Sequence, residues 1–513
     1  MANLTMDTTR VGSGVFPFDN SFARELEGFY IRLEPSVVPA PRLLFLNEAL
    51  AEELGLDLAS LDSATKAAIF AGNTLPDGAQ PLAQAYAGHQ FGGFSAQLGD
   101  GRALLLGEVI DRHGRRRDIA LKGSGRTPFA RGGDGKAAVG PMLREVLLGE
   151  AMHGLNIPTT RALAVAATGE PVYRDDVLPG AVLTRVAASH IRVGTFEFHA
   201  ARGDVQSVRR LAEYAIARHD PELVASPQRF LALLANVAAR QAALIAQWMN
   251  AGFIHGVMNT DNMTISGETI DYGPCAFMEA YDPTTVFSSI DDLGRYAFGN
   301  QPSIARWNLA RFAETLLPLL ADDHEQAVTA ATEVVARFPE RYRTHLLRGQ
   351  RAKLGLRRND PAHDDADAAL AADWLSLLHH EHVDFTLAWR RLADAAAGDE
   401  ARLRALFTDA RAPDAWLARW RARCNTESAA EGDAALSDFE RAEAMRSINP
   451  IIIARNHRVE EALTAASRDD DLGPFRSLLE ALREPYTDTP GSARYAQPAP
   501  AAVTARYRTF CGT

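Results

Sequence analysis

A short stretch in the middle of the chain carries the side chains best suited to hold a metal ion. Asp261 and Asn262 stand side by side, and Asp271 follows after an apolar Met263–Ile265 segment and a Ser-Gly turn. We expect this segment to form a hairpin that brings the three oxygen-bearing side chains to one edge. Mg²⁺ in proteins prefers one or two carboxylates together with substrate phosphates. The stretch therefore predicts a magnesium site, for which Asp261, Asn262 and Asp271 are the candidate ligands.

The same stretch has the layout of the catalytic and metal loops of kinase-like phosphotransferases. It begins with His255-Gly256 and closes on Asp271-Tyr272-Gly273. One position departs from that layout, because Val257 stands where the kinase pattern has its catalytic Asp, and valine cannot accept a proton. Either Asp261 has taken over as the base, or the chain does not perform ordinary kinase chemistry. Taken separately, His-Gly and Asp-Tyr-Gly are equally typical of plain turns.

Upstream of this stretch, short apolar strands alternate with glycine-rich turns. We expect strands over Phe94–Leu98, Ala103–Ile110 and Arg117–Lys122, joined as two hairpins by tight turns, the first being Gly99–Arg102. Backbone N–H groups around Gly99, Gly101 and Arg102 could cradle a phosphate, and Lys122 could reach the same anion. Alone, such a turn is more often only a turn, and a strand-terminal Lys is usually solvated. Their order and spacing favour a nucleotide site.

A flexible loop and a helix are predicted to follow. The segment Gly123–Gly135 is rich in Gly and Arg, and it can offer Asp134 and several backbone amides to a nucleotide, although a disordered surface loop is the alternative. Apolar recurrences predict a helix over Pro141–His153. In a kinase-like fold this helix supplies a Glu to the strand Lys. Glu145 is our choice and Glu150 the alternative, and for either one a solvated helix face is the ordinary interpretation.

Two more strands are predicted over Ala162–Ala167 and Ala181–Val186, separated by a turn at Thr168–Pro171 and a loop at Asp175-Asp176. They would complete a five-stranded sheet.

Two arginines accompany these strands beside the expected cleft. Arg185 and Arg192 could neutralise phosphates through bidentate hydrogen bonds. Surface arginines are common, so ordinary solvated side chains are the alternative.

The remaining chain is mostly expected to be helical. Near the N-terminus, the loop Gln84–Phe94 is either a packed functional loop or a plain buried turn. The acidic run Asp360–Asp367 is interpreted as an exposed loop rather than a metal cluster, because it combines Pro with like charges. Helices are predicted over Leu43–Leu54, Asp62–Phe70, Ser207–Arg218, Pro227–Asn250, a short segment after the cap Ser288–Asp292 that ends at Asn300–Pro302, Trp307–Leu320, most of 322–480, and a late helix starting at Asn449.

Composition narrows the possible functions. The 513 residues have a net charge of −11, 47% hydrophobic and 23% charged residues, and no long basic run, so extensive nucleic-acid binding is not expected. The N-terminus lacks the pattern of a signal peptide. The apolar segment Phe230 to Met249 is interrupted by polar residues and is interpreted as a buried helix rather than a membrane span. Three cysteines are too few for a disulfide framework, so a cytoplasmic, mainly reduced protein is expected. For the oligomeric state, a monomer is favoured.

Several motifs together resemble the selenoprotein O family, over nearly the whole chain. The motifs are Leu98-Gly-Asp-Gly-Arg102, Leu121-Lys-Gly-Ser-Gly125, Asn259-Thr-Asp-Asn-Met263, Asp271-Tyr-Gly-Pro-Cys-Ala-Phe277 and the near-terminal Cys511. The resemblance implies an α+β, protein-kinase-like bilobal fold. It also implies protein adenylyltransferase activity, in which ATP binds in a flipped orientation and AMP is moved to Ser, Thr or Tyr of other proteins.

The expected organisation has four parts. Residues 1–90 would form an N-terminal extension, 91–190 a small antiparallel-sheet N-lobe, 191–325 a helical C-lobe with the catalytic and metal loops, and 326–513 a helical C-terminal region.

The resemblance also implies a role for each site residue. Asp261 would be the proton acceptor, Asn262 and Asp271 would hold Mg²⁺ (or Mn²⁺), and Glu145 would pair with Lys122. The nucleotide-binding residues would be Gly99, Gly101, Arg102, Lys122, Asp134, Gly135, Arg185, Arg192 and Asp271.

A redox device is implied as well. In bacterial members a cysteine of the loop after the metal Asp can form a disulfide with one at the C-terminus, which suggests Cys275 with Cys511. The tail here ends Cys-Gly-Thr, where many relatives end Cys-Ser-Ser, and Tyr272 replaces the commoner Phe.

Two rival functions remain open at this point. An ordinary kinase would use the γ-phosphate and would be expected to carry a carboxylate at Val257, which the chain lacks. An inactive nucleotide-binding pseudokinase scaffold would have little need of Lys122, Asn262 and Asp271 together.

Overall fold

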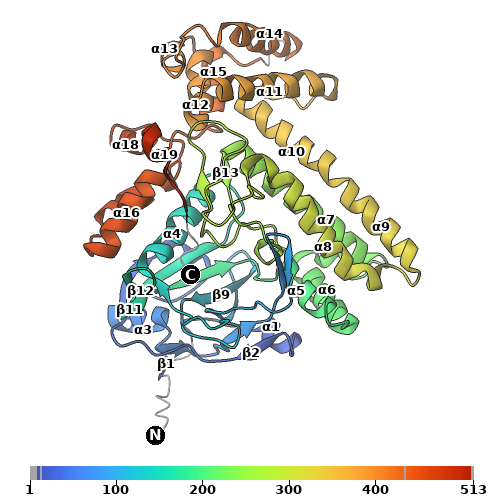
Figure 1. Ribbon diagram of the computed structural model, residues 1–513, viewed down its shortest axis with the longest axis vertical. Coiled ribbons are helices and arrows are strands. Elements are labelled where there is room, and N and C mark those ends of the chain that lie inside the picture. The colour runs from blue at the N-terminus through green and yellow to red at the C-terminus, as the bar shows by residue number, and fades with distance from the viewer. Residues whose placement is uncertain (1–8, 12–13, 432–434, 510–513) are drawn as a thin grey trace.

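The computed structural model describes residues 9–11, 14–431 and 435–509. An antiparallel sheet occupies one half of the molecule, and helices form the rest (Figure 1). The sheet runs in the order β2-β5-β8-β9-β12-β11-β3, and β10 pairs with β12. Its strands are β2 (Tyr30–Arg32), β3 (Arg42–Leu46), β5 (Leu82–Gln84), β8 (Ala103–Ile110), β9 (Arg116–Lys122), β10 (Ala137–Ala138), β11 (Arg161–Tyr173) and β12 (Val177–Ala187).

The prediction of a five-stranded sheet is wrong, because this sheet has eight strands. Three of the additional strands, β2, β3 and β5, come from the first 90 residues. Two of these are only three residues long, so they carry too few alternations for a sequence pattern to reveal. The prediction of a helix over Leu43–Leu54 is wrong in its first half, because Arg42–Leu46 pairs with β11 and only α2 (Glu48–Glu53) is helical.

The first predicted hairpin is also wrong. Residues Gly93–Ser95 (β7) pair with Gly88–Gln90 (β6) in a separate two-stranded ribbon, and β8 pairs with β5 and β9. The turn Gly99–Arg102 therefore leads into β8 from a loop. The strand predictions Ala103–Ile110 and Arg117–Lys122 are confirmed, and these strands pair as the second hairpin.

Strands β11 and β12 are longer than predicted. The expected turn at Thr168–Pro171 lies within β11, where the register shifts as in a β-bulge between Ala167 and Pro171. The chain reverses after Tyr173, so the Asp175-Asp176 loop is the hairpin turn. Glycine permits this bulge, because Gly169 has a positive φ of 75° and lies against Ala40.

Helices cover both faces of the sheet. Helices α2 and α3 (Ser63–Ala71) pack with one set of strand side chains, which includes Val182 and Val186 of β12. Helix α4 (Val139–Gly154) packs with the alternate set, which includes Leu183. Because side chains alternate along a strand, Arg185 shares the α4 face with Leu183. Helices α16 (Asn456–Arg468) and α17 (Gly473–Arg483) lie behind α4.

The helical half is arranged around a long central helix, α7 (Arg229–Ala251), which ends at Gly252 in the left-handed conformation. Figure 1 shows α7 to α10 along one side of the molecule and α11 to α15 together at the end away from the sheet. Besides α7, the helical half contains α5 (Val193–Ala200), α6 (Val205–His219), α8 (Gln301–Leu320), α9 (His324–Ala336), α10 (Phe338–Lys353), α11 (Asp364–His380), α12 (Phe385–Ala396), α13 (Ala401–Arg404), α14 (Asp414–Glu431) and α15 (Asp438–Arg446).

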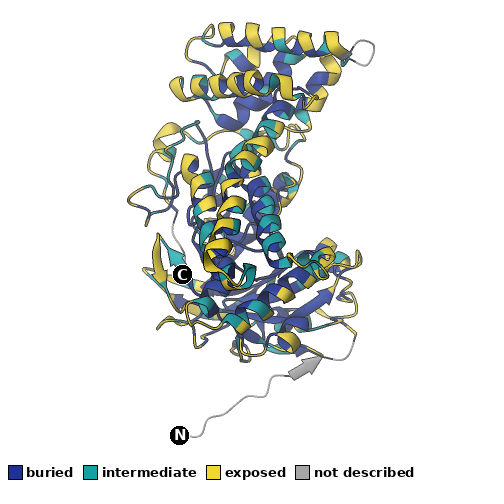
Figure 2. Cartoon of the chain, turned by 90° about the vertical axis from the view of Figure 1, so that its right-hand side faces the viewer, coloured by how far each residue is buried: buried dark blue, intermediate teal, exposed yellow. Residues whose placement is uncertain are grey.

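Burial follows this arrangement. Figure 2 shows the strands and the inner faces of the helices buried, and the outer helix faces exposed. By length and composition, α7 could cross a membrane, but 56% of its most apolar window is buried inside the fold. It is therefore placed as a core helix, as the sequence predicts.

Three helix predictions need correction. No α-helix forms between Ser288 and Asn300, because the Asp291 carboxylate accepts the N–H groups of Arg295 and Tyr296 in a turn, and only a 3-10 turn (Phe298–Asn300) follows. Helix α8 instead begins at Gln301, with Pro302 in its first turn, where a missing N–H is harmless. The late helix begins at Asn456 rather than Asn449.

The acidic run Asp360–Asp367 is not only an exposed loop. It contains a 3-10 turn (Pro361–His363) and the first turn of α11, where acidic side chains favour the helix N-terminus. Asp367 is fully buried and binds the guanidinium groups of Arg351 and Arg423.

Candidate active site

A cleft of about 1160 Å³ opens between the sheet and the helical half. The glycine turn before β8 and the end of β9 form one wall, and the loop of residues 257–262 forms the facing wall. The N-terminal end of α4, part of α16 and the tail residues 506–509 close its outer side. The cleft therefore collects segments that lie far apart in the sequence.

Sheet register places two cations on the same face of the sheet. In the pairing of β9 with β12, Lys122 lies opposite Leu183 and Arg185 lies opposite Ala120. Both long side chains reach Asp271: Lys122 Nζ lies 2.7 Å and Arg185 Nη1 2.6 Å from Asp271 Oδ1. The pairing expected at the sequence level is seen in the contacts, because Lys122 also donates a hydrogen bond to Glu145 on α4.

The alternative carboxylate, Glu150, has different partners. It accepts hydrogen bonds from Arg161 and Arg483 and not from Lys122. It lies on α4 in a position that ties this helix to β11 and α17.

A third cation comes from the start of α5. Arg192 is the N-cap residue of that helix, and its guanidinium lies 4.5 Å from the ring centre of Tyr86. Its Nη1 donates to the backbone carbonyl of Asp261 at 3.2 Å and lies 3.6 Å from Asp271 Oδ2. The structure thus brings Arg185 and Arg192 together at one carboxylate.

These contacts control the charge of Asp271. Burial raises its pKa, but Lys122, Arg185 and Arg192 outweigh burial and hold the pKa well below the ordinary value. Asp271 also has a φ of +62°, which is unusual for a residue with a side chain. Such backbone strain concentrates at functional sites, where surrounding contacts hold it in place.

The loop that carries Asn262 is held by contacts between side chains and backbone carbonyl groups. His255 Nε2 is 2.8 Å from the carbonyl oxygen of Ile270, which ties this loop to the segment before Asp271. Asn262 donates its side-chain N–H to the carbonyl of Val257 at 3.0 Å, so its amide oxygen is the atom left for an ion. The expected hairpin between them is not formed, because Thr264 bridges to Arg192 and Thr269 bridges to Thr159.

The donor set suits a hard cation that also binds substrate phosphates. Among the described residues, no group of three or more His, Cys, Asp or Glu side chains is placed to hold a metal ion. Asn262 and Asp271 offer one amide oxygen and one carboxylate. Mg²⁺ is commonly held by so few protein ligands when phosphates and waters complete its shell.

Asp261 has the environment of a proton acceptor. It is 8% exposed, and its Oδ1 has no hydrogen-bond partner among the described residues. Burial raises the pKa of Asp261 to about 6, although Arg192 opposes the shift. A base with a pKa close to the working pH is effective in proton transfer. Gly88 of β6 lies so close that a Cβ there would be 2.5 Å from Asp261 Oδ1.

The loop predicted to be flexible is folded over the glycine turn. Phe129 is buried, and a Cβ on Gly99 would lie 2.5 Å from its ring. A Cβ on Gly135 would lie 2.2 Å from the backbone of Gly125, so the two ends of the loop touch. Asp134 forms an ion pair with Arg174 at 2.9 Å. Gly101 and Arg102 line the same cleft.

Several residues at the cleft were missed by sequence reasoning. Asp100, inside the glycine turn, is buried, accepts the N–H of Gln84 at 3.0 Å and lies 3.9 Å from Arg192. Burial raises its pKa. Arg144 on α4 donates to the carbonyls of Gly273 and Cys275. Asp100 was visible within the turn motif, but no local signal distinguishes a buried turn Asp from a solvated one.

Only one of the two cysteines of the expected disulfide, Cys275, lies in the part of the chain that the structure describes. Cys275 is fully buried, and burial raises the pKa of its thiol to about 11. Cys511 lies outside the described residues. The described tail does reach this loop, because Thr509 donates to the carbonyl of Pro274 at 2.7 Å and its N–H donates to Phe287.

Comparison with known proteins identifies the family to which the chain belongs. The family model described as protein adenylyltransferase SelO matches residues 15–483. A protein named protein nucleotidyltransferase YdiU from Cereibacter sphaeroides is 62% identical over 97% of this chain and 100% of its own length. Proteins of that name from Chromobacterium violaceum (61% identical, 94% of this chain and 98% of its own) and Rhizobium etli (56%, 98% and 98%) are also similar. The chain therefore belongs to the protein adenylyltransferase SelO family.

Proposed function

We propose that this enzyme transfers AMP from ATP to the hydroxyl groups of Ser, Thr or Tyr side chains of proteins and releases pyrophosphate. Family membership supports nucleotidyl transfer, and the site adds the chemistry. The observation that carries the proposal is the convergence of Lys122, Arg185 and Arg192 on Asp271, beside the buried Asp261. Transfer of a phosphorus group depends mainly on positioning and on neutralising developing charge.

In this reaction the acceptor oxygen forms a bond to the α-phosphorus while the bond from that phosphorus to the bridging oxygen of pyrophosphate breaks. Asp261 would accept the proton of the hydroxyl group. Lys122, Arg185 and Arg192 would neutralise the phosphates, with Glu145 fixing Lys122. Backbone groups around Gly99, Gly101, Arg102, Asp134 and Gly135 would hold the rest of the nucleotide.

Asn262 and Asp271 would hold a divalent cation, Mg²⁺ or Mn²⁺. When bound, it would offset phosphate charge and orient the leaving pyrophosphate. In holding the ion, Asp271 would give up part of its contact with Lys122 and Arg185, and these two side chains would then be available to phosphate oxygens.

The arrangement also supports the proposal of a kinase-like bilobal organisation. The sheet with α4 would correspond to the small lobe and α5 to α8 to the helical lobe, with the cleft between them. The boundaries 1–90, 91–190, 191–325 and 326–513 remain a proposal, as do a cytoplasmic location and a Cys275–Cys511 disulfide. The strands β2, β3 and β5 favour counting part of residues 1–90 with the sheet.

Labelled ATP distinguishes the candidate functions. The purified chain would be incubated with Mg²⁺, a generic protein acceptor and ATP labelled at either the α or the γ phosphate. Label from the α position alone is expected, on the acceptor or on the enzyme itself. Label from the γ position alone would make the chain an ordinary kinase and would overturn the role of Asp261. Binding of ATP without any transfer would identify an inactive scaffold.

A further inference from the structure

We propose that His190 is a positioning residue that aims the guanidinium of Arg185 at the nucleotide phosphates. The proposal rests on the proposed function, since it concerns the same site. His190 lies in the linker that follows β12 and precedes α5, and it is 3% exposed. No sequence motif draws attention to it. Its contacts connect the cleft with a second buried cluster of charge.

The contacts of His190 determine which of its ring nitrogens carries the proton. Arg185 Nε donates to His190 Nε2 at 3.2 Å, and a guanidinium can only donate. Nε2 must therefore accept, so the ring hydrogen lies on Nδ1. Nδ1 is 2.9 Å from Asp118 Oδ2 and donates to it, and the backbone N–H of His190 donates to the same oxygen at 2.8 Å. The ring orientation is fixed from two directions.

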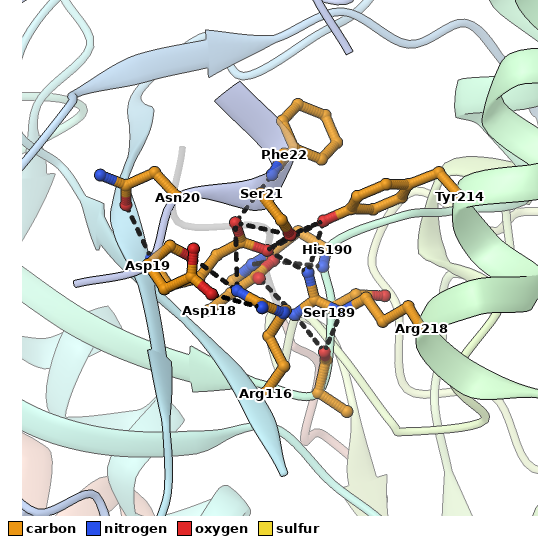
Figure 3. Close-up of polar contacts among 12 residues, drawn as sticks. Asp19, Asn20, Ser21, Phe22, Arg116, Asp118, Ser189, His190, Tyr214 and Arg218 are labelled. Atoms are coloured by element: carbon orange, nitrogen blue, oxygen red, sulfur yellow. Dashed lines mark hydrogen bonds and ion pairs between the residues drawn. The ribbon is translucent and has the colours of Figure 1, made fainter. Parts of the chain in front are cut away.

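Asp118 is itself held firmly. Burial opposes its ionisation, but Arg218 and His190 outweigh burial and lower its pKa to about 2. Figure 3 shows Asp118, His190 and Arg218 in one continuous set of polar contacts with Tyr214 and Ser21. Arg218 bridges Asp118 to Glu108, which lies directly opposite Asp118 in the pairing of β8 with β9. The His190 ring is therefore held by a carboxylate whose own position is fixed by Arg218.

Arg185 needs this support for a physical reason. Its other close partner is Asp271 Oδ1, and Glu145 Oε2 lies farther away at 3.9 Å. A cation bound to Asp271 would compete for that oxygen. A long arginine side chain close to Lys122 and Arg192 would then gain freedom to move away from like charge. The bond from Nε to His190 does not involve Asp271, so it keeps the guanidinium plane in place. Such outer contacts commonly change affinity or activity by roughly 10- to 100-fold.

Two substitutions at one position separate this role from packing. In H190Q, the side-chain oxygen reaches the place of Nε2 and can accept from Arg185, while the side-chain contact with Asp118 is lost. In H190N, the amide nitrogen takes the place of Nδ1 and can donate to Asp118, while the acceptor for Arg185 is lost. We expect H190N to weaken the binding of ATP with Mg²⁺, measured by calorimetry, by roughly 10- to 100-fold. H190Q should retain most of the affinity.

His219 offers a matched control. It is a second histidine beside the linker, and its Nε2 lies 2.9 Å from Ser189 Oγ without touching Arg185. H219Q should lower the thermal unfolding temperature without a selective loss of ATP affinity. Thermal unfolding of H190N and H190Q is measured in parallel, so that misfolding is recognised.

A second measurement tests whether His190 acts through Arg185. In an R185A background, H190N should cause no additional loss of ATP affinity. Equal losses in H190N and H190Q, or a full additional loss in R185A, would overturn the proposal. If the wild-type chain bound ATP but transferred no AMP, the proposed function would fail, while the comparison of the two variants would still decide the role of His190.

Discussion

Two buried clusters of charge lie on the same face of the sheet. They differ in whether all of their buried polar atoms have hydrogen-bond partners. In the rear cluster, Glu108 and Asp118 face each other across β8 and β9, and Arg218 bridges them. The hydroxyl of Tyr214 and the N–H of Phe22 also donate to Glu108. In the cleft cluster, Asp261 Oδ1 and Arg192 Nε have no partner among the described residues.

This difference separates a structural role from a functional one. Buried polar groups are normally hydrogen-bonded, so an unpartnered oxygen and an unpartnered N–H beside a cleft indicate a place for a ligand. Within the described part of the chain, the carboxylate oxygens of the rear cluster all have hydrogen-bond partners, and this cluster anchors α6 and the linker to the sheet. His190 belongs to the rear cluster by its contact with Asp118 and to the cleft cluster by its contact with Arg185.

The largest effect is expected from removing the carboxylate at the centre of the cleft cluster. D271A should reduce transfer of label from α-labelled ATP by at least about 10³-fold, because the proposed metal ligand is lost and three cations lose their shared partner. The control is D271N, since Asn tolerates the left-handed backbone at this position. D271N should also be inactive, and thermal unfolding of both variants, measured in parallel, shows whether the inactive protein is still folded. A near-wild-type rate in either variant would refute the metal assignment.

The close approach of Gly88 to Asp261 predicts a strong effect on the transfer rate, smaller than that of D271A. In G88A, the new Cβ would meet Asp261 Oδ1 at 2.5 Å, so the carboxylate has to move. A displacement of about 1 Å at a reacting group can reduce the rate by roughly 10²-fold. G93A is the matched control in the partner strand β7, where a Cβ would lie 3.5 Å from the nearest atom. Both variants should retain ATP binding, and equal rates in the two would argue against Asp261 as the base.

The rear cluster should respond in stability. R218M leaves Glu108 and Asp118 buried without their shared cation, which costs about 3–5 kcal/mol in comparable cases. Urea denaturation measures the free energy of unfolding directly. If R218M were as stable as the wild type, the rear cluster would not be the anchor that its contacts suggest.

The smallest effect concerns the pH dependence of stability. Burial raises the pKa of Glu268 to about 7, although the N–H of Ala188 and Arg117 oppose the shift. The folded state then binds a proton more tightly than the unfolded state, so stability should fall as pH rises from about 4.5 to about 7. E268Q should flatten the stability curve over this range. An unchanged curve would show that other groups dominate it.

Local patterns were sufficient for much of the fold. The strands Ala103–Ile110 and Arg117–Lys122, the helix over Pro141–His153 and the long helix before Gly252 were all predicted, because each has a clear period or a glycine at its end. The misassigned Arg42–Leu46 segment is apolar and short, so its sequence fits either structure.

Long-range pairing explains what could not be predicted. The strands β2, β3 and β5 exist because partners far along the chain complete their hydrogen bonds. The folded loop around Phe129 depends in the same way on Gly99, which is distant in sequence. A composition rich in glycine is typical both of flexible loops and of close backbone packing.

By itself, the sequence determined the chemistry available at the site. The motif spacing singled out Asp261, Asn262 and Asp271, and the missing carboxylate at Val257 turned attention to Asp261 as the base. These conclusions depend on side-chain identity and on short spacing, which a single chain displays directly.

Only the tertiary structure decided how these groups are tuned. The register of β9 with β12 brought Arg185 to Asp271, and the fold of β6 buried Asp261 behind Gly88. The contact from Asp118 through His190 to Arg185 likewise joins residues from β9, the linker and β12. The charge state and aim of a side chain depend on neighbours supplied by other strands and helices, and the spacing along one chain does not specify those neighbours.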